Sequence, residues 1–203
     1  DLSEQYDPLR TLWRSWDMGF VRPACVGFQI DKHGRKNVLF SIMGHNIQLT
    51  DFIDEVESYC NEILPKVVEK MDILPHDANR KYDVSPHSAL DIFVGKGLKA
   101  DTIYVKRDMS HAQVNEELKK FTKGEPMLRL DSKHCVLLAQ CLAGYTRHEQ
   151  TGQPRKDNYY EHISDAFKLG CFYVSRKLTE TNTELKEPQY FGLEFGGGSS
   201  RIL

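Results

Sequence analysis

The sequence predicts an α/β domain built on a mixed central sheet, in which three antiparallel strands precede parallel strands and helices cover both faces. Two observations support this prediction. Residues 11–43 contain three apolar or alternating segments joined by short loops, which is typical of an antiparallel meander. From residue 50 onward, helical and strand-like patterns alternate, which favours parallel strands with crossover helices.

The composition is that of a packed domain without a strong charge bias. The 203 residues are 40% hydrophobic and 28% charged, and the formal net charge is −2. A chain of this length forms one domain, or one domain with appendages. Because the charge is nearly balanced, there is no global basic field, and a polyanionic partner must be held by a local patch.

The cysteines and the apolar runs argue against a disulfide-stabilised protein, a zinc site and a membrane-spanning protein. The five cysteines are Cys25, Cys60, Cys135, Cys141 and Cys171. They form no C-x-x-C pair and lie in apolar segments, which favours reduced core thiols over disulfides or a zinc site. No apolar run approaches the roughly 20 residues of a membrane span and no signal peptide is visible, so no membrane partner is expected. The chain begins at Asp1 rather than Met, so we expect processing or excision from a longer protein.

The expected elements follow from the local patterns. The first strand covers residues 11–18 and ends at Asp17, after a polar and irregular beginning. Further strands are expected over 25–31, 36–43, 71–75 and 102–106, with 127–130 as a short strand or an extended link. Helices are expected over 50–65 with Thr50 as cap, 85–94 with Ser85 at its start, 110–121 with Ser110 as cap, 131–145 and 159–176. Residues 1–176 would then form the domain and 177–203 a polar, partly disordered tail.

The last predicted helix carries an acid in an unusual position. This helix is apolar almost all round, which predicts burial between layers. Asp165 heads one apolar row, at i, i+4, i+7 spacing with Leu169 and Phe172. A carboxylate in such a row is costly to desolvate without a partner, and a metal ion would compensate it. The alternative is a solvated acid near the helix start, favoured by the helix dipole, and the spacing leaves both readings open.

Two other acids close predicted strands. Asp17 ends the first strand and Asp77 follows the strand over 71–75, so tertiary structure could bring both to Asp165. Each of the two also fits a simple turn former. The alternative acids in the same region are Asp72, Asp83, Asp91 and Asp101.

Taken together, three segments resemble the nuclease domain of viral large terminase subunits, the motors that cut and package DNA in tailed bacteriophages. The segments are Trp16-Asp17-Met18-Gly19-Phe20 with Arg22-Pro23, Leu74-Pro75-His76-Asp77-Ala78, and His162-Ile163-Ser164-Asp165-Ala166-Phe167. The match spans about residues 11–176. The sequence departs from the family at Met18, where many members have a small or polar residue, and the family's motor half is not present.

The resemblance implies a ribonuclease H-like fold and a metal-dependent endonuclease that cuts concatemeric double-stranded DNA with little sequence specificity. It implies that Asp17 bridges two ions, that Asp77 and Asp165 each bind one of them, and that His162 has a secondary role. Carboxylate ligands suit Mg²⁺ or Mn²⁺, and two such ions stabilise the attacking and leaving oxygens of a phosphodiester.

The same resemblance implies partners and a location. The expected partners are double-stranded DNA, the ATPase domain of the same full-length protein, the portal and the small terminase subunit, in the host cytoplasm during virus assembly and outside the mature virion. Gly95-Lys96-Gly97 lacks the pattern of a phosphate-binding loop, so no ATP site is expected. The candidate DNA-contacting residues are Arg22, Lys96, Lys99, Lys106, Arg107, Arg155 and Lys156, with the loop 146–158 facing DNA.

Three other interpretations fit the sequence. The first is another ribonuclease H-like nuclease or resolvase, in which the same acids would serve a branched or hybrid substrate. The second is a non-catalytic docking domain of the packaging motor. The third is an α/β domain whose three acids never meet.

Overall fold

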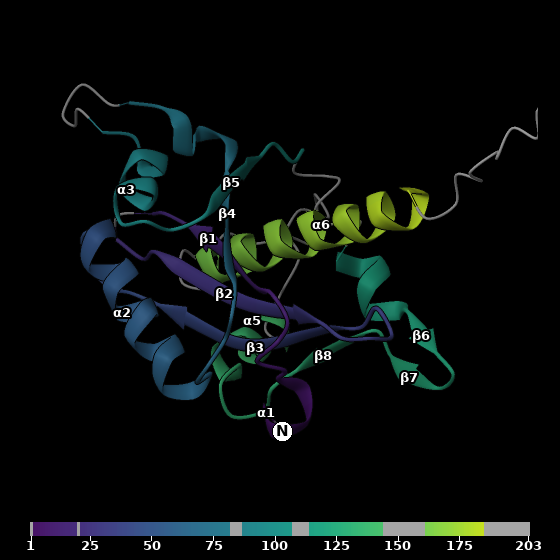
Figure 1. Ribbon diagram of the computed structural model, residues 1–203. Coiled ribbons are helices and arrows are strands. Elements are labelled where there is room, and N and C mark those ends of the chain that lie inside the picture. The colour runs from purple at the N-terminus through teal and green to yellow at the C-terminus, as the bar shows by residue number, and fades with distance from the viewer. Residues whose placement is uncertain (1, 20, 82–86, 107–113, 144–160, 185–203) are drawn as a thin grey trace, which may run out of the picture.

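A six-stranded mixed sheet forms the centre of the molecule and helices cover both of its faces. The computed structural model describes residues 2–19, 21–81, 87–106, 114–143 and 161–184 (Figure 1). The strand order is β5-β4-β1-β2-β3-β8, and a separate two-stranded ribbon is formed by β6 and β7. The predicted fold class is therefore confirmed.

The antiparallel half of the sheet is a meander. It consists of β1 (Leu12–Asp17), β2 (Ala24–Ile30) and β3 (Lys36–Met43), with β2 antiparallel to both of its neighbours. All three strands are largely buried, because helices cover both sides of the sheet. The three strands predicted over residues 11–43 are confirmed.

The parallel half places the ends of three strands at one edge. The strand β4 (Lys70–Pro75) pairs in parallel with β1, and β5 (Ala100–Ile103) pairs in parallel with β4. On the other side, β8 (Leu128–Leu130) pairs in parallel with β3. Because β1, β4 and β5 run the same way, their carboxyl ends meet at the same edge of the sheet. Asp17 closes β1 there, and the 3₁₀ turn η1 (His76–Asn79) follows β4 directly.

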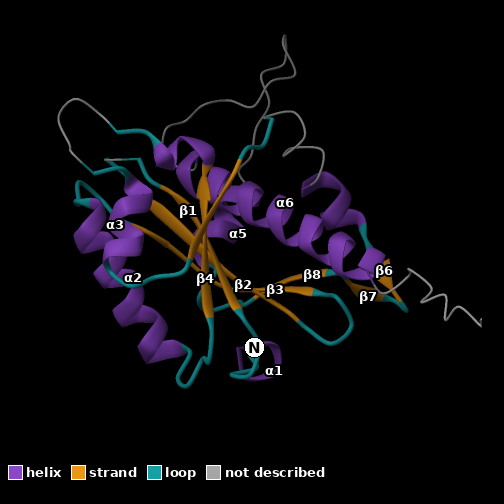
Figure 2. Cartoon of the chain, turned by 45° about the horizontal axis from the view of Figure 1, so that its top comes forward, coloured by secondary structure: helices purple, strands orange, loops and turns teal. Residues whose placement is uncertain are grey.

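The described helices lie on both faces of the sheet. On one face, α2 (Leu49–Ile63) and α3 (Ala89–Gly95) pack over a core centred on Trp16. On the other face lie α5 (Val136–Ala143) and the long α6 (Glu161–Glu184), which crosses the strands in Figure 2. The buried side chains Val26, Phe28, Val38, Ile163 and Phe167 form the core beneath them. The predicted burial of the last helix is confirmed.

Several helix ends differ from the sequence prediction. The helix α2 begins at Leu49 with Gln48 as its N-cap, not at Thr50, and no side chain caps it. The helix α3 begins after Ser88 because a complete capping box forms there: the Ser88 hydroxyl accepts from the Asp91 amide at 3.1 Å, and the Asp91 carboxylate accepts from the Ser88 amide at 2.9 Å. The predicted start at Ser85 lies outside the described residues.

Short elements also appear where the prediction had none. A helical turn, α1 (Leu2–Gln5), stands in the segment expected to be irregular. The ribbon of β6 (Phe121–Thr122) and β7 (Glu125–Pro126) replaces the end of the helix predicted over 110–121. Its turn residues Lys123 and Gly124 both have positive φ, at 54° and 81°, as a tight hairpin turn requires.

The final helix is longer than predicted. It continues through Glu184, past the expected end at Arg176. Leu178 packs against a buried cluster that includes Ile73 and Tyr173, and the Thr179 hydroxyl donates to the Ser175 carbonyl at 3.0 Å. The first residues of the predicted tail are therefore helical, and residues 185–203 lie outside the described part of the chain.

The thiols match the sequence prediction. All five cysteines are free and buried. Burial raises the pKa of the Cys60 thiol to about 11 and that of Cys135 to about 12, so both thiols are protonated at neutral pH. Across the described helices, no segment is both long and apolar enough to cross a membrane.

A glycine sets the distance between α6 and the sheet. A Cβ at Gly170 would lie 2.3 Å from Cε2 of Phe28 and 2.9 Å from Cβ of Ser15. Only a residue without a side chain allows this approach, and α6 carries Asp165 five residues earlier. The packing at Gly170 therefore helps to place that acid.

We expect Gly170→Ala to lower the free energy of unfolding by about 1–3 kcal/mol, because the added methyl group overpacks the contact with Phe28. Gly95→Ala is the matched control, since no atom lies within 4 Å of its Cβ position. It should leave stability unchanged or raise it slightly. Urea unfolding followed by circular dichroism measures both, and equal effects of the two substitutions would contradict the packing argument.

Candidate active site

The three acids singled out in the sequence line one pocket. Asp17 at the end of β1, Asp77 in η1 after β4, and Asp165 in α6 face a hollow of about 270 Å³. Its wall is completed by Trp16, Pro75, Val105, Lys168 and Leu169. The parallel pairing of β1 with β4 brings the first two acids to the same sheet edge, and the packing of α6 adds the third.

Asp17 is hydrogen-bonded to His162. Nδ1 of His162 lies 2.9 Å from Oδ2 of Asp17, and about a quarter of each side chain is exposed. Gly19 makes room for the ring, because a Cβ there would lie 2.7 Å from Cε1 of His162. The hydrogen bond to Asp17 raises the pKa of His162; burial opposes this, and the charges of Asp17, Glu161 and Asp165 add to it. His162 thus contacts Asp17 rather than its helix neighbour Asp165.

Asp165 is paired with a lysine. Nζ of Lys168 lies 2.9 Å from Oδ1 of Asp165, one turn along α6. The carboxylate is 43% exposed and the lysine side chain 11% exposed. Asp165 is therefore neither a fully solvated acid nor a buried one, and it has a cationic partner that spacing alone did not assign.

Asp77 borders two hollows. Besides the acid pocket, it lines a neighbouring pocket of about 380 Å³ together with Asp17. Arg80 and His87 lie on the wall of that second pocket, together with apolar residues of α2 and α3. The backbone amide of Arg80 donates to the Asp77 carbonyl at 2.9 Å, which fixes the turn that carries the acid.

The acid pocket fits a divalent ion in its chemistry but not in its present side-chain positions. Three carboxylates offer the oxygen ligands that Mg²⁺ and Mn²⁺ prefer. Within the described residues, however, no three His, Cys, Asp or Glu side chains are arranged to hold one ion. Asp17 and Asp165 accept hydrogen bonds from His162 and Lys168 instead, so ion binding requires at least one carboxylate to turn.

The alternative acids have structural roles. Asp72 forms a buried ion pair with Arg14, and Asp91 completes the capping box of α3. Asp101 accepts a hydrogen bond of 2.7 Å from the Tyr173 hydroxyl. Asp83 lies outside the described residues. The three described alternatives are thus already used by the fold.

The four candidate DNA-contacting residues that the structure describes are not gathered at the pocket. Lys96 pairs with Asp54 of α2 at 2.6 Å, and Lys99 pairs with Glu69 at 2.9 Å, next to the start of β5 and so away from the acid edge. Lys106 is exposed and directly follows Val105 of the pocket wall. Arg22 is partly exposed in the connection between β1 and β2. Arg107, Arg155, Lys156 and the loop 146–158 lie outside the described residues.

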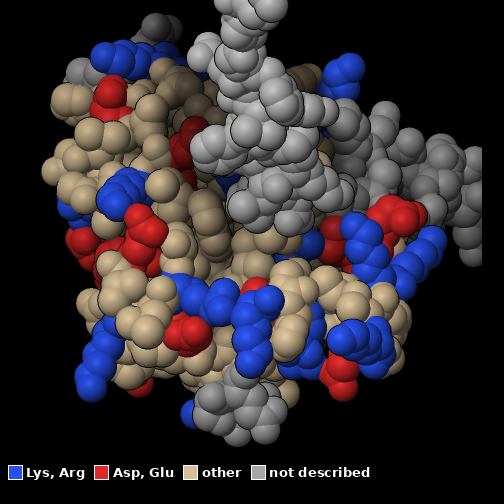
Figure 3. Space-filling model, turned by 45° about the vertical axis from the view of Figure 1, so that its right-hand side comes forward, with Lys and Arg blue, Asp and Glu red and all other residues tan. Residues whose placement is uncertain are grey.

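One face of the molecule shows the charge balance seen in the composition (Figure 3). On the face drawn in Figure 3, basic and acidic side chains are interspersed rather than separated into one large basic field. Three basic residues that the sequence analysis did not select lie at the two pockets: Lys168, Arg80 and His87. Of these, Lys168 could have been found from its i, i+3 spacing with Asp165.

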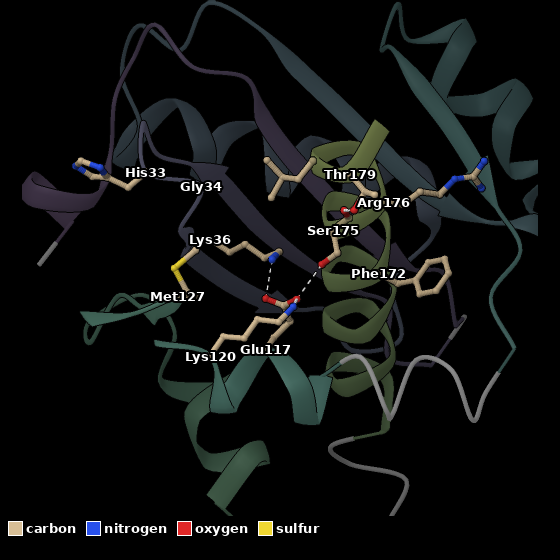
Figure 4. Close-up of a pocket in the computed structure, with 11 residues that line it drawn as sticks. His33, Gly34, Lys36, Glu117, Lys120, Met127, Phe172, Ser175, Arg176 and Thr179 are labelled. Atoms are coloured by element: carbon tan, nitrogen blue, oxygen red, sulfur yellow. Dashed lines mark hydrogen bonds and ion pairs between the residues drawn. The ribbon is translucent and has the colours of Figure 1, made fainter. Parts of the chain in front are cut away.

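A second buried ion pair anchors the far half of α6. Nζ of Lys36, at the start of β3, lies 2.6 Å from Oε2 of Glu117, and both side chains are almost fully buried (Figure 4). The Ser175 hydroxyl of α6 and Nζ of Lys120 donate to Oε1 of the same carboxylate, at 3.1 and 3.0 Å. Burial alone would raise the pKa of Glu117, but the two lysines outweigh burial and lower it. This cluster borders a pocket of about 480 Å³ at the opposite end of the helix from Asp165.

Comparison with known proteins places the fold. No protein-family model matches the sequence, and no curated protein matches it. Among solved structures, the large terminase of bacteriophage HK97 superposes with a TM-score of 0.50 at 11% identity, over 84% of this chain and 42% of that chain. The chain has a ribonuclease H-like fold.

Other solved structures match with lower TM-scores. The resolvase of fowlpox virus, solved with Holliday junction DNA, has a TM-score of 0.44 at 16% identity, over 82% of this chain and 99% of that one. The terminase nuclease domain of human cytomegalovirus, soaked with Mn, has a TM-score of 0.45 at 10% identity, over 83% and 85%.

The contact between His162 and Asp17 predicts a pH dependence. Because Asp17 raises the pKa of His162 in the folded state, the pair contributes stability below the unfolded pKa of about 6.5 and loses it as the pH rises through the folded value. In chelator, raising the pH from 5.5 to 8.5 should therefore cost the wild type more stability than Asp17→Asn.

NMR titration of the His162 ring should show its pKa falling in Asp17→Asn. Urea unfolding at the two pH values measures the stability change. An unchanged His162 pKa in the variant would show that the hydrogen bond does not exist in solution.

Proposed function

We propose that this chain is a divalent-metal-dependent endodeoxyribonuclease domain that hydrolyses phosphodiester bonds of double-stranded DNA with little sequence specificity. One observation carries the proposal: three carboxylates from β1, η1 and α6, far apart in the sequence, line one pocket. The ribonuclease H-like fold supports it, because the acids lie where its sheet edge and last helix meet.

The chemistry follows from the donor set. Asp17, Asp77 and Asp165 would hold Mg²⁺ or Mn²⁺, which when bound would lower the pKa of water and neutralise charge on the attacking and leaving oxygens. In the reaction a water oxygen bonds to phosphorus, the bond from phosphorus to the leaving oxygen breaks, and the water's proton ends on that oxygen or in solvent. His162, hydrogen-bonded to Asp17, orients this carboxylate.

The proposed setting is viral DNA packaging. The three motif segments resemble terminase nuclease domains, and the HK97 protein of the same fold is a bacteriophage large terminase. This chain spans 42% of the HK97 chain, so an ATPase domain would belong to a longer protein. We infer that the portal and the small terminase subunit are partners, and that cutting takes place in the host cytoplasm during assembly.

Plasmid digestion tests the activity. The wild type should nick supercoiled plasmid with Mn²⁺ or Mg²⁺ and not with chelator, and Asp77→Ala should slow nicking roughly 100-fold or more, the scale for losing a charge contact in the transition state. Asp51→Ala is the control: Asp51 is an exposed acid in the first turn of α2, outside the pocket. Nicking that survives Asp77→Ala would refute the assignment.

The substrate separates this proposal from a resolvase. A panel of linear duplex, four-way junction and RNA–DNA hybrid should show cutting of the linear duplex at least as fast as of the others. Strong preference for the junction would replace the packaging role with resolution of branched DNA, and the acids would keep their roles.

Metal binding should also be visible without DNA. At a concentration about 100-fold above the dissociation constant, an ion that binds only the folded state adds about 2.7 kcal/mol, or roughly 5–10 °C in melting temperature for a chain of this size. Asp17→Asn should remove most of this gain, as measured by thermal unfolding with Mn²⁺ and with chelator. If neither Mn²⁺ nor Mg²⁺ changed the melting temperature of the wild type, the proposed metal site would be wrong.

A further inference from the structure

Lys168 is a nearly buried cation inside the acid pocket, and the reaction proposed above gives it no role. The residue is 9% exposed and lines the pocket together with Asp17, Asp77 and Asp165. Its Nζ lies 2.9 Å from Oδ1 of Asp165. Most lysines in proteins are exposed, so a lysine in this position requires an explanation.

The position is built by the helix and its surroundings. Lys168 follows Asp165 by three residues, so both side chains lie on one face of α6. The neighbouring pocket wall is apolar, with Trp16, Val105 and Leu169. An ammonium group withdrawn from water in such a place is costly unless it is paired, and Asp165 supplies the negative charge. The ammonium is thus held at the acids rather than directed to solvent.

The pairing has a consequence for ion binding. Each of two divalent ions would need carboxylate oxygens of this pocket, and the second ion would have to share Asp165 with Lys168. Like charges at such short distances repel strongly where water is partly excluded. Asp17 and Asp77 lie at the strand ends, and within the described residues neither forms an ion pair with a lysine. The pocket is therefore arranged for fewer divalent ions than its three acids suggest.

We propose that Lys168 is a catalytic residue that takes the place of a second divalent ion. One ion is held by Asp17 and Asp77, and the ammonium of Lys168, held by Asp165, donates a hydrogen bond to an oxygen of the scissile phosphate. Lys168 keeps its proton throughout and contributes only fixed positive charge. This inference rests on the proposed nuclease function and revises the two-ion mechanism that the family resemblance implies.

The stoichiometry of Mn²⁺ binding tests it, without DNA or turnover. Electron paramagnetic resonance of free Mn²⁺ counts ions bound by the wild type and by Lys168→Met, which keeps the length and apolar stem of the side chain but removes the charge. Lys168→Arg keeps the charge. It therefore shows whether any substitution at this position disrupts the fold. Lys177→Met is the matched control, because it removes a lysine from the same helix, nine residues further along and outside the acid pocket.

We expect one Mn²⁺ per chain in the wild type, Lys168→Arg and Lys177→Met, and two in Lys168→Met. Plasmid nicking under the same conditions should fall at least tenfold in Lys168→Met and much less in Lys168→Arg.

The failures are distinguishable. Two ions in the wild type, or one ion in Lys168→Met, would overturn the role of Lys168 and leave the nuclease proposal intact. No bound ion in any of the four proteins would overturn both. A Lys168→Met protein that binds two ions and nicks at the wild-type rate would show that the lysine excludes an ion without contacting the substrate, and would overturn its catalytic role.

Discussion

The relative position of the neighbouring strands β1 and β4 depends on one buried ion pair. Arg14 of β1 and Asp72 of β4 lie opposite each other in the parallel register, and both side chains are fully buried. The contact is bidentate, with Nε to Oδ1 at 2.8 Å and Nη2 to Oδ2 at 2.6 Å, and Nε1 of Trp16 donates to Oδ1 at 2.7 Å. Burial raises the pKa of Asp72, and Arg14 offsets only part of that rise. Sliding β1 along β4 would separate this pair and leave the buried Asp72 without its cationic partner, which is strongly destabilising.

The register fixed by this ion pair also determines the positions of two acids of the candidate site. Asp17 follows Arg14 within β1, and Asp77 follows Asp72 just beyond β4, so a fixed register between the pair fixes the relative height of the two acids. Glu57 of α2 also bonds Arg14 and accepts from Lys70 at 2.5 Å. Buried ion pairs add little net stability compared with apolar packing, but they select one arrangement over its neighbours. Here the arrangement selected is the one that brings two carboxylates to one edge.

The sequence predicted the sheet well because its signals there are local. Apolar alternation identified β2 and β3, and the acid at the end of β1 marked its edge. The burial of both faces of the strands was harder to predict from the sequence. Gln29 is fully buried because the backbone of Asp7 and Arg10, in the segment before β1, forms hydrogen bonds with its side-chain amide. The ends of helices were predicted less well because they depend on specific side-chain contacts. Ser88 caps α3 through a reciprocal contact with Asp91, whereas the prediction chose Ser85 because Pro86 follows it, at a position where proline suits the first turn of a helix.

The candidate site was predictable to the level of strand ends and no further. The carboxyl ends of parallel strands meet at one edge, so acids placed there can be expected to converge, and they line one pocket. Which carboxylate His162 contacts depends on the space above Gly19, which no spacing rule contains. The spacing of residues along the chain also assigned no cationic partner to Asp165. Three clustered carboxylates repel one another. In this fold His162 is hydrogen-bonded to Asp17 and Lys168 is paired with Asp165, which reduces that repulsion. A nuclease site built in this way balances part of its charge from its own chain, and any ion that binds must compete with those two side chains for the same oxygens.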